Sequence, residues 1–134
     1  MFIERKTHNN YRLICKHSCH VLKYGNQGIK VSSFGRLTNV QINSLNRCVL
    51  KIIRKFKNKK SIKLWNLVLL NFNLTKLSSE SRMGKGKGAV FSKAVFIRPG
   101  NIIFEFEGVS LQQTLLILSS LKKLSHLKLS IVKK

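Results

Sequence analysis

The feature that most constrains this chain is its charge: 26 Lys or Arg residues stand against four acids, and the net charge is +22. The acids are Glu4, Glu80, Glu105 and Glu107, and Asp is absent. Because few cations can pair within the chain, self-repulsion opposes compaction unless an anionic partner supplies counter-charge. The scarcity of carboxylates also excludes most chemistry that needs paired acids. We therefore expect a densely anionic partner and no enzymatic activity.

The apolar content shows that the chain still folds around a core. Hydrophobic residues make up 43% of the 134, which is too many for a disordered basic tail. A chain of this length forms one domain and buries roughly two-thirds of its unfolded surface. No apolar run approaches the roughly 18 residues that a membrane span needs. Nucleic acid is the first partner to expect, and an anionic membrane surface is the second.

Two capping boxes predict where helices begin. Thr38 with Gln41 and Ser110 with Gln113 have the required spacing. Apolar residues follow the first at helical spacing, namely Ile42, Leu45, Val49, Ile52, Ile53 and Phe56, and the second is followed by Leu111, Leu115, Leu118 and Leu121. The opposite face of the first helix carries Arg47, Lys51, Arg54 and Lys55, and the basic run 57–60 ends this helix.

Strands are predicted on both sides of the Pro99-Gly100 turn, at 93–98 and 101–107. In the second strand, Phe104 and Phe106 fall on one face and Glu105 and Glu107 on the other. Residues 62–70 read as one buried strand and 127–131 as a last strand.

The remaining segments carry turn and loop signals. We expect a small hairpin or loop at 24–34 and irregular structure at 71–81. The order predicts one α+β domain over 24–134, in which an antiparallel or mixed sheet carries two helices on one face. Residues 1–23 are basic and aperiodic, and we expect a basic N-terminal arm.

The string RMGKGKG predicts a protruding glycine-rich loop that contacts phosphates. Glycine at every second position lets the backbone approach a surface closely, and the cations between them suit an anion. The string contains Arg82, Met83, Gly84, Lys85, Gly86, Lys87 and Gly88. It is neither a Walker A sequence nor GxGxxG. The alternative is a flexible basic loop in solvent.

Further candidates for polyanion contact are the basic helix face and the arm residues Arg5, Lys6 and Arg12. A solvated charged face is the alternative for the helix. The arm also contains C-x-H-x-C-H, formed by Cys15, His17, Cys19 and His20. That spacing matches no common zinc pattern, so we expect neither a metal site nor a cofactor. We expect Trp65 to be a core or half-buried residue rather than one stacked on a base.

Three stretches together resemble the L-sixteen family of large-subunit ribosomal proteins. The most specific is SRMGKGKG followed by KAVFIRPGNIIFEFEGVS, and YGNQGIKVSSFGRLT and the KLW of residues 63–65 match as well. The resemblance covers about 24–132. The chain departs from the family at 71–79, where a proline-rich segment is replaced by NFNLTKLSS.

The resemblance implies an α+β structural protein that binds large-subunit rRNA and touches neighbouring ribosomal proteins, with no membrane or small-molecule substrate. It places the loop closest to tRNA in the aminoacyl site, near the peptidyl-transferase centre, and matches Arg36 to a basic family position. Abundant Lys, Asn and Ile with two Ala and one Pro indicate an AT-rich, organellar genome, and divergence favours the mitochondrion over the plastid. The alternative is a basic RNA-binding or RNA-modifying protein outside the ribosome.

Overall fold

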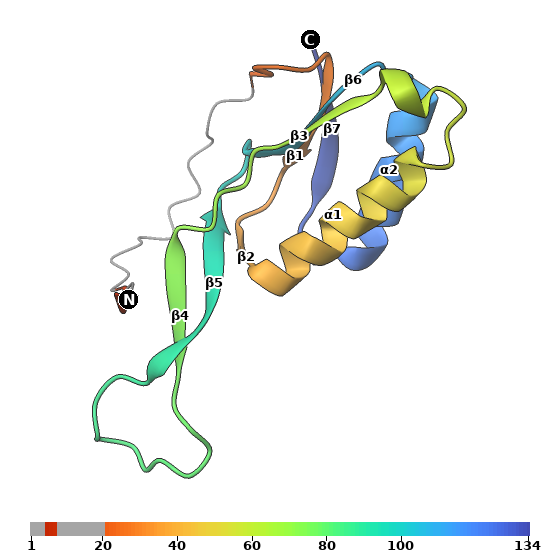
Figure 1. The fold of residues 1–134 in the computed structure, drawn as a ribbon. Helices are drawn as coiled ribbons and strands as arrows, with labels where there is room; N and C mark the ends of the chain where they lie inside the picture. Colours follow the sequence, from red (N-terminus) through yellow and green to blue (C-terminus); the bar gives the residue numbers. More distant parts are fainter. Residues whose placement is uncertain (1–4, 8–20) are drawn as a thin grey trace.

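The computed structural model describes residues 5–7 and 21–134 (Figure 1). Seven strands, two helices and one short 3-10 turn make up this described part. Their order is β1 (Gln27–Val31), β2 (Gly35–Thr38), α1 (Asn39–Ile53), η1 (Lys59–Ser61), β3 (Lys63–Asn66), β4 (Phe72–Lys76), β5 (Ala89–Ile97), β6 (Ile102–Glu107), α2 (Leu111–Leu124) and β7 (Leu129–Lys133).

The strands form two antiparallel sheets, which confirms the α+β prediction and refines it. One sheet has the order β3-β6-β1-β7 and the other the order β2-β5-β4. Every strand pair in both sheets is antiparallel. Helices α1 and α2 pack against each other, and both lie on the same side of the four-stranded sheet (Figure 1). The β4–β5 ribbon extends away from this body.

Both predicted capping boxes are confirmed. The Thr38 amide donates to Gln41 Oε1 at 2.9 Å, and the Gln41 amide donates back to Thr38 Oγ1 at 3.5 Å. Ser110 and Gln113 make the same pair of bonds at 3.0 and 3.3 Å. Helix α1 ends at Ile53, earlier than the apolar spacing indicates, because the last turn tightens into bonds between residues three apart, such as Lys55 to Ile52.

The core lies between the helices and the four-stranded sheet. Helix α1 contributes all of its predicted apolar positions from Ile42 to Ile53, and β6 contributes Phe104 and Phe106, which are almost fully buried. In α2 the buried face runs through Thr114, Ile117, Leu118 and Leu121. Leu111 and Leu115, which share the predicted spacing, are exposed.

Three strand predictions are wrong or incomplete. Residues 27–31 form a central strand between β6 and β7 instead of part of a small local hairpin or loop. There Gly28 is needed for close packing rather than for a turn, because a Cβ would lie 2.6 Å from Leu22 Cδ2. Residues 72–76 pair with β5 as strand β4 instead of being irregular. Of the predicted strand at 62–70, only the four residues of β3 pair with β6.

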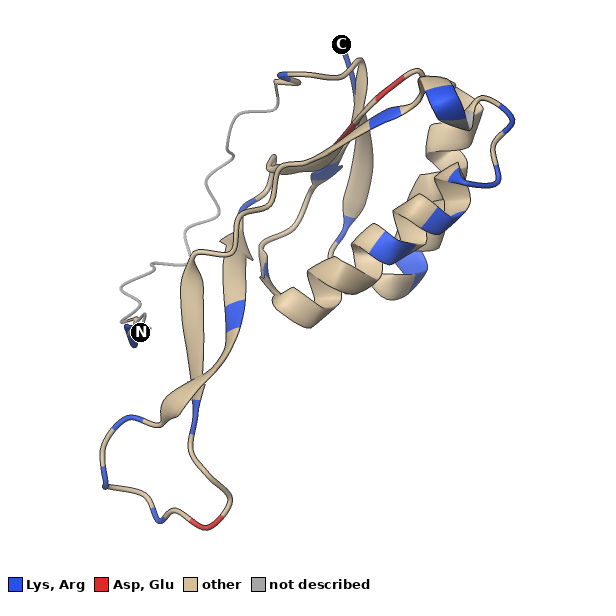
Figure 2. Ribbon diagram, in the orientation of Figure 1, with Lys and Arg blue, Asp and Glu red and all other residues tan. Residues whose placement is uncertain are grey.

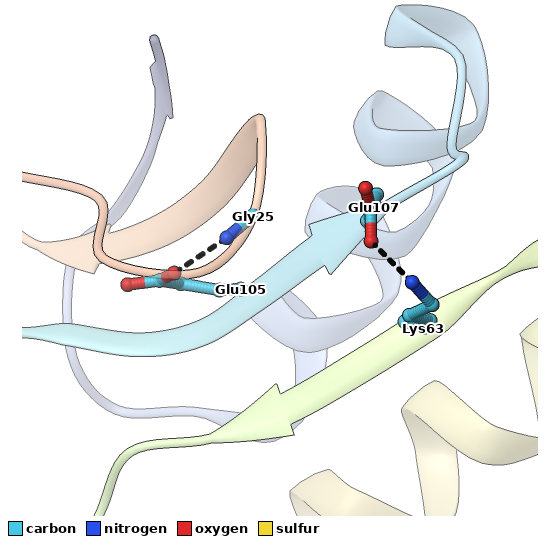
Figure 3. Close-up of polar contacts among 4 residues, drawn as sticks. All are labelled: Gly25, Lys63, Glu105 and Glu107. Atoms are coloured by element: carbon cyan, nitrogen blue, oxygen red, sulfur yellow. Dashed lines mark hydrogen bonds and ion pairs between the residues drawn. The ribbon is translucent and has the colours of Figure 1, made fainter.

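Glu105 is buried, although its alternation with Phe104 and Phe106 predicts an exposed face. Its carboxylate accepts the backbone amides of Lys23, Tyr24 and Gly25 at 3.1, 2.7 and 2.9 Å (Figure 3 draws the Gly25 bond). Burial alone raises the pKa of this carboxyl, but these three amides and the Lys23 charge together hold the pKa below its ordinary value. The carboxylate therefore fixes the chain leading into β1.

Candidate RNA interface

The predicted glycine-rich loop is the tip of the β4–β5 ribbon. Residues 77–88 have no regular structure and project from the body (Figure 1). The side chains of Arg82, Met83, Lys85 and Lys87 are all exposed, and Met83 is exposed to 94%. These four side chains are therefore accessible to a partner.

Glycine is required in this loop for two different structural reasons. Gly84 and Gly86 have φ of +95° and +91°, and a Cβ added at either position would meet no other atom within 4 Å. Positive φ strains any residue with a Cβ, so these two positions fix the path of the tip. At Gly88 a Cβ would come within 2.4 Å of the Lys76 carbonyl oxygen. The absence of a side chain at Gly88 therefore lets β4 and β5 approach closely at the base of the loop, which we call the neck.

A short part of the arm binds to the free edge of β4, beside this neck. Thr7 Oγ1 donates to the Asn73 carbonyl at 3.0 Å and accepts the Asn73 amide at 3.2 Å. The Asn73 side chain donates to the Arg5 carbonyl at 2.9 Å. Lys6 Nζ donates to the Lys87 carbonyl at 2.8 Å, and Lys87 Nζ donates to the Thr7 carbonyl at 2.6 Å. The predicted arm residues Arg5 and Lys6 therefore lie next to the loop.

The basic face of α1 forms a separate group of cations. Arg47, Lys51, Arg54 and Lys55 are exposed on the helix and at its end, and Lys57 and Lys60 are exposed in the turn that follows. Figure 2 shows this group away from the cations of the loop. Arg36 is exposed on β2, opposite Phe96 of β5. Apart from Arg36, the described cations among the predicted residues fall on two surfaces. The loop surface comprises Arg5, Lys6 and residues 82–88, and the helix surface comprises Arg47, Lys51, Arg54, Lys55, Lys57 and Lys60.

Few of these charges are neutralised by acids of the described residues. Between described residues there is one ion pair, which joins Lys63 Nζ to Glu107 at 3.0 Å (Figure 3). Glu105 is occupied by backbone amides, and Glu80 lies in the exposed loop. The positive field of both surfaces is therefore left to an external partner.

Two predictions fall on the arm outside the described residues. Arg12 lies there, and so does the C-x-H-x-C-H segment from Cys15 to His20. Within residues 5–7 and 21–134, no group of His, Cys, Asp and Glu has the arrangement to hold a metal ion. In the same ranges no helix is long and apolar enough to cross a membrane. Trp65 is half-buried and stacks on Tyr24, with ring centroids 5.9 Å apart.

Sequence reasoning missed Asn73 and Phe91, which both lie on the ribbon. Asn73 holds the arm, and Phe91 is an exposed aromatic residue near the loop. The missed signal is the alternation of apolar and polar residues in FNLTK, which is typical of a half-buried strand. That signal covers only five residues.

The fold and the two cationic surfaces define a class: a small basic α+β protein with exposed, largely unpaired cations among its described residues. Comparison with known proteins identifies the family within that class. The model of the family described as Ribosomal protein L16p/L10e matches residues 3–131. The chain therefore belongs to this ribosomal protein family, which is one of structural proteins and not of enzymes.

Similar proteins come from an alga and from bacteria. The Large ribosomal subunit protein uL16m of Chondrus crispus is 53% identical over 124 residues, which covers 92% of this chain and 90% of the relative. The Large ribosomal subunit protein uL16 of Stenotrophomonas maltophilia is 34% identical over 106 residues, covering 79% and 74%. The uL16 protein of Psychrobacter cryohalolentis matches with the same identity and coverage.

Proposed function

We propose that this protein is a structural constituent of the mitochondrial large ribosomal subunit, where it binds rRNA and helps to shape the aminoacyl-tRNA site. Membership in the ribosomal family supports the first part. The algal relative supports the organelle, because the suffix of the name uL16m denotes the mitochondrial protein. In this subunit rRNA and neighbouring ribosomal proteins are the partners.

One observation carries the proposal for the tRNA site: the ribbon presents an exposed cationic tip far from the core. Arg82, Lys85 and Lys87 lie within six residues there, and the backbone between them takes conformations that favour glycine. A narrow tip of this kind reaches into a crevice between RNA segments, and its bare backbone approaches phosphates closely. Peptide-bond chemistry then belongs to the RNA, and the protein positions its substrates.

The helix surface serves as the anchor on rRNA in this proposal. Its exposed cations lie on one helix and the turn after it, and the described structure leaves them without ion pairs to acids. Each phosphate that a cation neutralises releases counterions, so affinity falls steeply with salt, with a log–log slope of roughly −0.7 to −0.9 per contact.

The test is the salt dependence of binding between the full-length protein and its large-subunit rRNA. Replacing Arg47, Lys51, Arg54 and Lys55 together by Gln is expected to reduce the slope by roughly three. The matched control replaces Lys122 and Lys123, which are exposed on α2, and is expected to change the slope little. A wild-type affinity that hardly changes between low and moderate salt contradicts the proposed mechanism.

A further inference from the structure

One aromatic side chain of the ribbon is exposed at a β-bulge. In the register of β4 with β5, Leu74 pairs with Ser92 and Thr75 pairs with Val90, so Phe91 is the extra residue. Bulges are over-represented beside functional sites. Phe91 is 70% exposed, and Ala89 and Lys93, two residues away on either side, are exposed as well.

The surroundings of Phe91 are cationic and contain no acid among the described residues that line them. The Lys76 ammonium lies over the ring, 5.4 Å from its centroid. The ring also borders a hollow of about 590 Å³ between β5 and the start of α1, which is lined by Val40 and Lys93 as well. The first turn of α1 has no acidic residue, so the positive end of the helix dipole faces this region uncompensated.

This combination suits a ligand that has both a flat apolar surface and a negative charge. The exposed ring offers a stacking face, the hollow offers room, and Lys76 offers pairing for a phosphate. An unpaired nucleotide of RNA has both properties, and base stacking on aromatic residues tolerates any base. An apolar protein segment would leave the charge of Lys76 without compensation.

We infer that Phe91 is a stacking site for an unpaired base of RNA, with Lys76 positioned for an adjoining phosphate. The inference rests on the proposed function, because it names a further contact with the same class of partner. It adds a contact at the root of the glycine-rich loop, on the face of the ribbon toward α1. The loop surface is then bound to RNA at both its tip and its base.

The experiment uses the full-length protein and a single-stranded oligoribonucleotide of about 12 nucleotides, within the length that such sites cover. One position holds 2-aminopurine, whose fluorescence is quenched when it stacks on an aromatic ring. A second oligonucleotide has an abasic site at that position. The variants are Phe91→Leu, which keeps apolar area without an aromatic face, and Phe91→Trp, which keeps the face. Leu124→Ala, at an apolar position of α2 that is 57% exposed, is the control.

We expect three proteins to quench the 2-aminopurine fluorescence: wild type, Phe91→Trp and Leu124→Ala. We expect their affinity for the 2-aminopurine oligonucleotide to exceed that for the abasic oligonucleotide about five-fold or more. Phe91→Leu is expected to lose both effects while its salt slope stays that of wild type. Equal quenching by Phe91→Leu overturns the inference, and so does a wild-type protein that binds both oligonucleotides equally. In these cases steep salt dependence still upholds the proposed function. Failure of the wild type to bind RNA in a salt-dependent way overturns both.

Discussion

Replacing Glu105 by Gln tests whether one buried carboxylate fixes the entry to the central strand. One of its oxygens accepts two amides, from Tyr24 and Gly25, and the other accepts the Lys23 amide. Glutamine keeps one acceptor oxygen but turns an amide group toward the remaining donors. Hydrogen bonds to a charged group contribute about 1.5–3 kcal/mol each, so losing one or two of them lowers the free energy of unfolding by about 2–4 kcal/mol.

The pH dependence of that loss has a definite sign. Because the folded state holds the pKa of Glu105 below its ordinary value, the unfolded chain takes up a proton first on acidification. The stabilisation is therefore complete above the ordinary pKa of about 4.5 and disappears as the pH falls through the lowered value. Wild type is expected to lose stability faster than Glu105→Gln in this acidic range, so the two unfolding curves converge.

The assay is urea unfolding of both proteins from neutral pH down to about pH 3, at moderate salt to limit self-repulsion. Glu107→Gln is the matched control, because Glu107 makes a solvent-exposed pair with Lys63 that contributes at most about 1 kcal/mol. A difference between wild type and Glu105→Gln that stays below about 1 kcal/mol at neutral pH refutes the reasoning. A difference that does not shrink on acidification refutes it as well.

Three further substitutions test the ribbon and the first helix. Gly88→Ala forces a Cβ against the Lys76 carbonyl and is expected to lower the free energy of unfolding, measured with urea, by about 1–3 kcal/mol. An unchanged unfolding midpoint counts against a close approach of the two strands at Gly88. Asn73→Ala removes the bond to the Arg5 carbonyl and is expected to speed hydrogen exchange of the Lys6 and Thr7 amides but not of the β6 amides. Unchanged exchange at Lys6 and Thr7 means that this bond does not hold the arm. Thr38→Ala removes the α1 cap and is expected to cost about 1 kcal/mol, and a loss below a few tenths argues against that cap.

The sequence predicts the helices better than the strands, for a physical reason. A helix is specified by local signals, and the Thr38 and Ser110 boxes with the apolar spacing after Thr38 are confirmed by the structure. A strand depends on partners far along the chain. Gly25 and Gly28 therefore read as turn signals, yet residues 27–31 form the central strand because β6 and β7 flank them.

The same distinction between local signals and long-range contacts applies to the candidate site. The exposed cations of the loop and of α1 can be identified from residue type and spacing alone, and the structure places them at the surface. The contact between the arm and Asn73 cannot be identified in this way, because it joins residues that are 66 to 68 positions apart in the sequence. The exposed position of Phe91 cannot be identified either, because the first half of β5 is defined by its pairing with β4, a separate segment of the chain.

The central claim, that the loop helps to shape the aminoacyl-tRNA site, is tested most directly by tRNA binding to mitochondrial large subunits that carry a neutralised loop. The variant replaces Arg82, Lys85 and Lys87 by Gln and leaves the glycines in place. We expect normal incorporation into the subunit and normal peptidyl-site binding, with weaker binding of aminoacyl-tRNA. Aminoacyl-tRNA binding equal to that of wild-type subunits, at full incorporation of the variant, contradicts the claim.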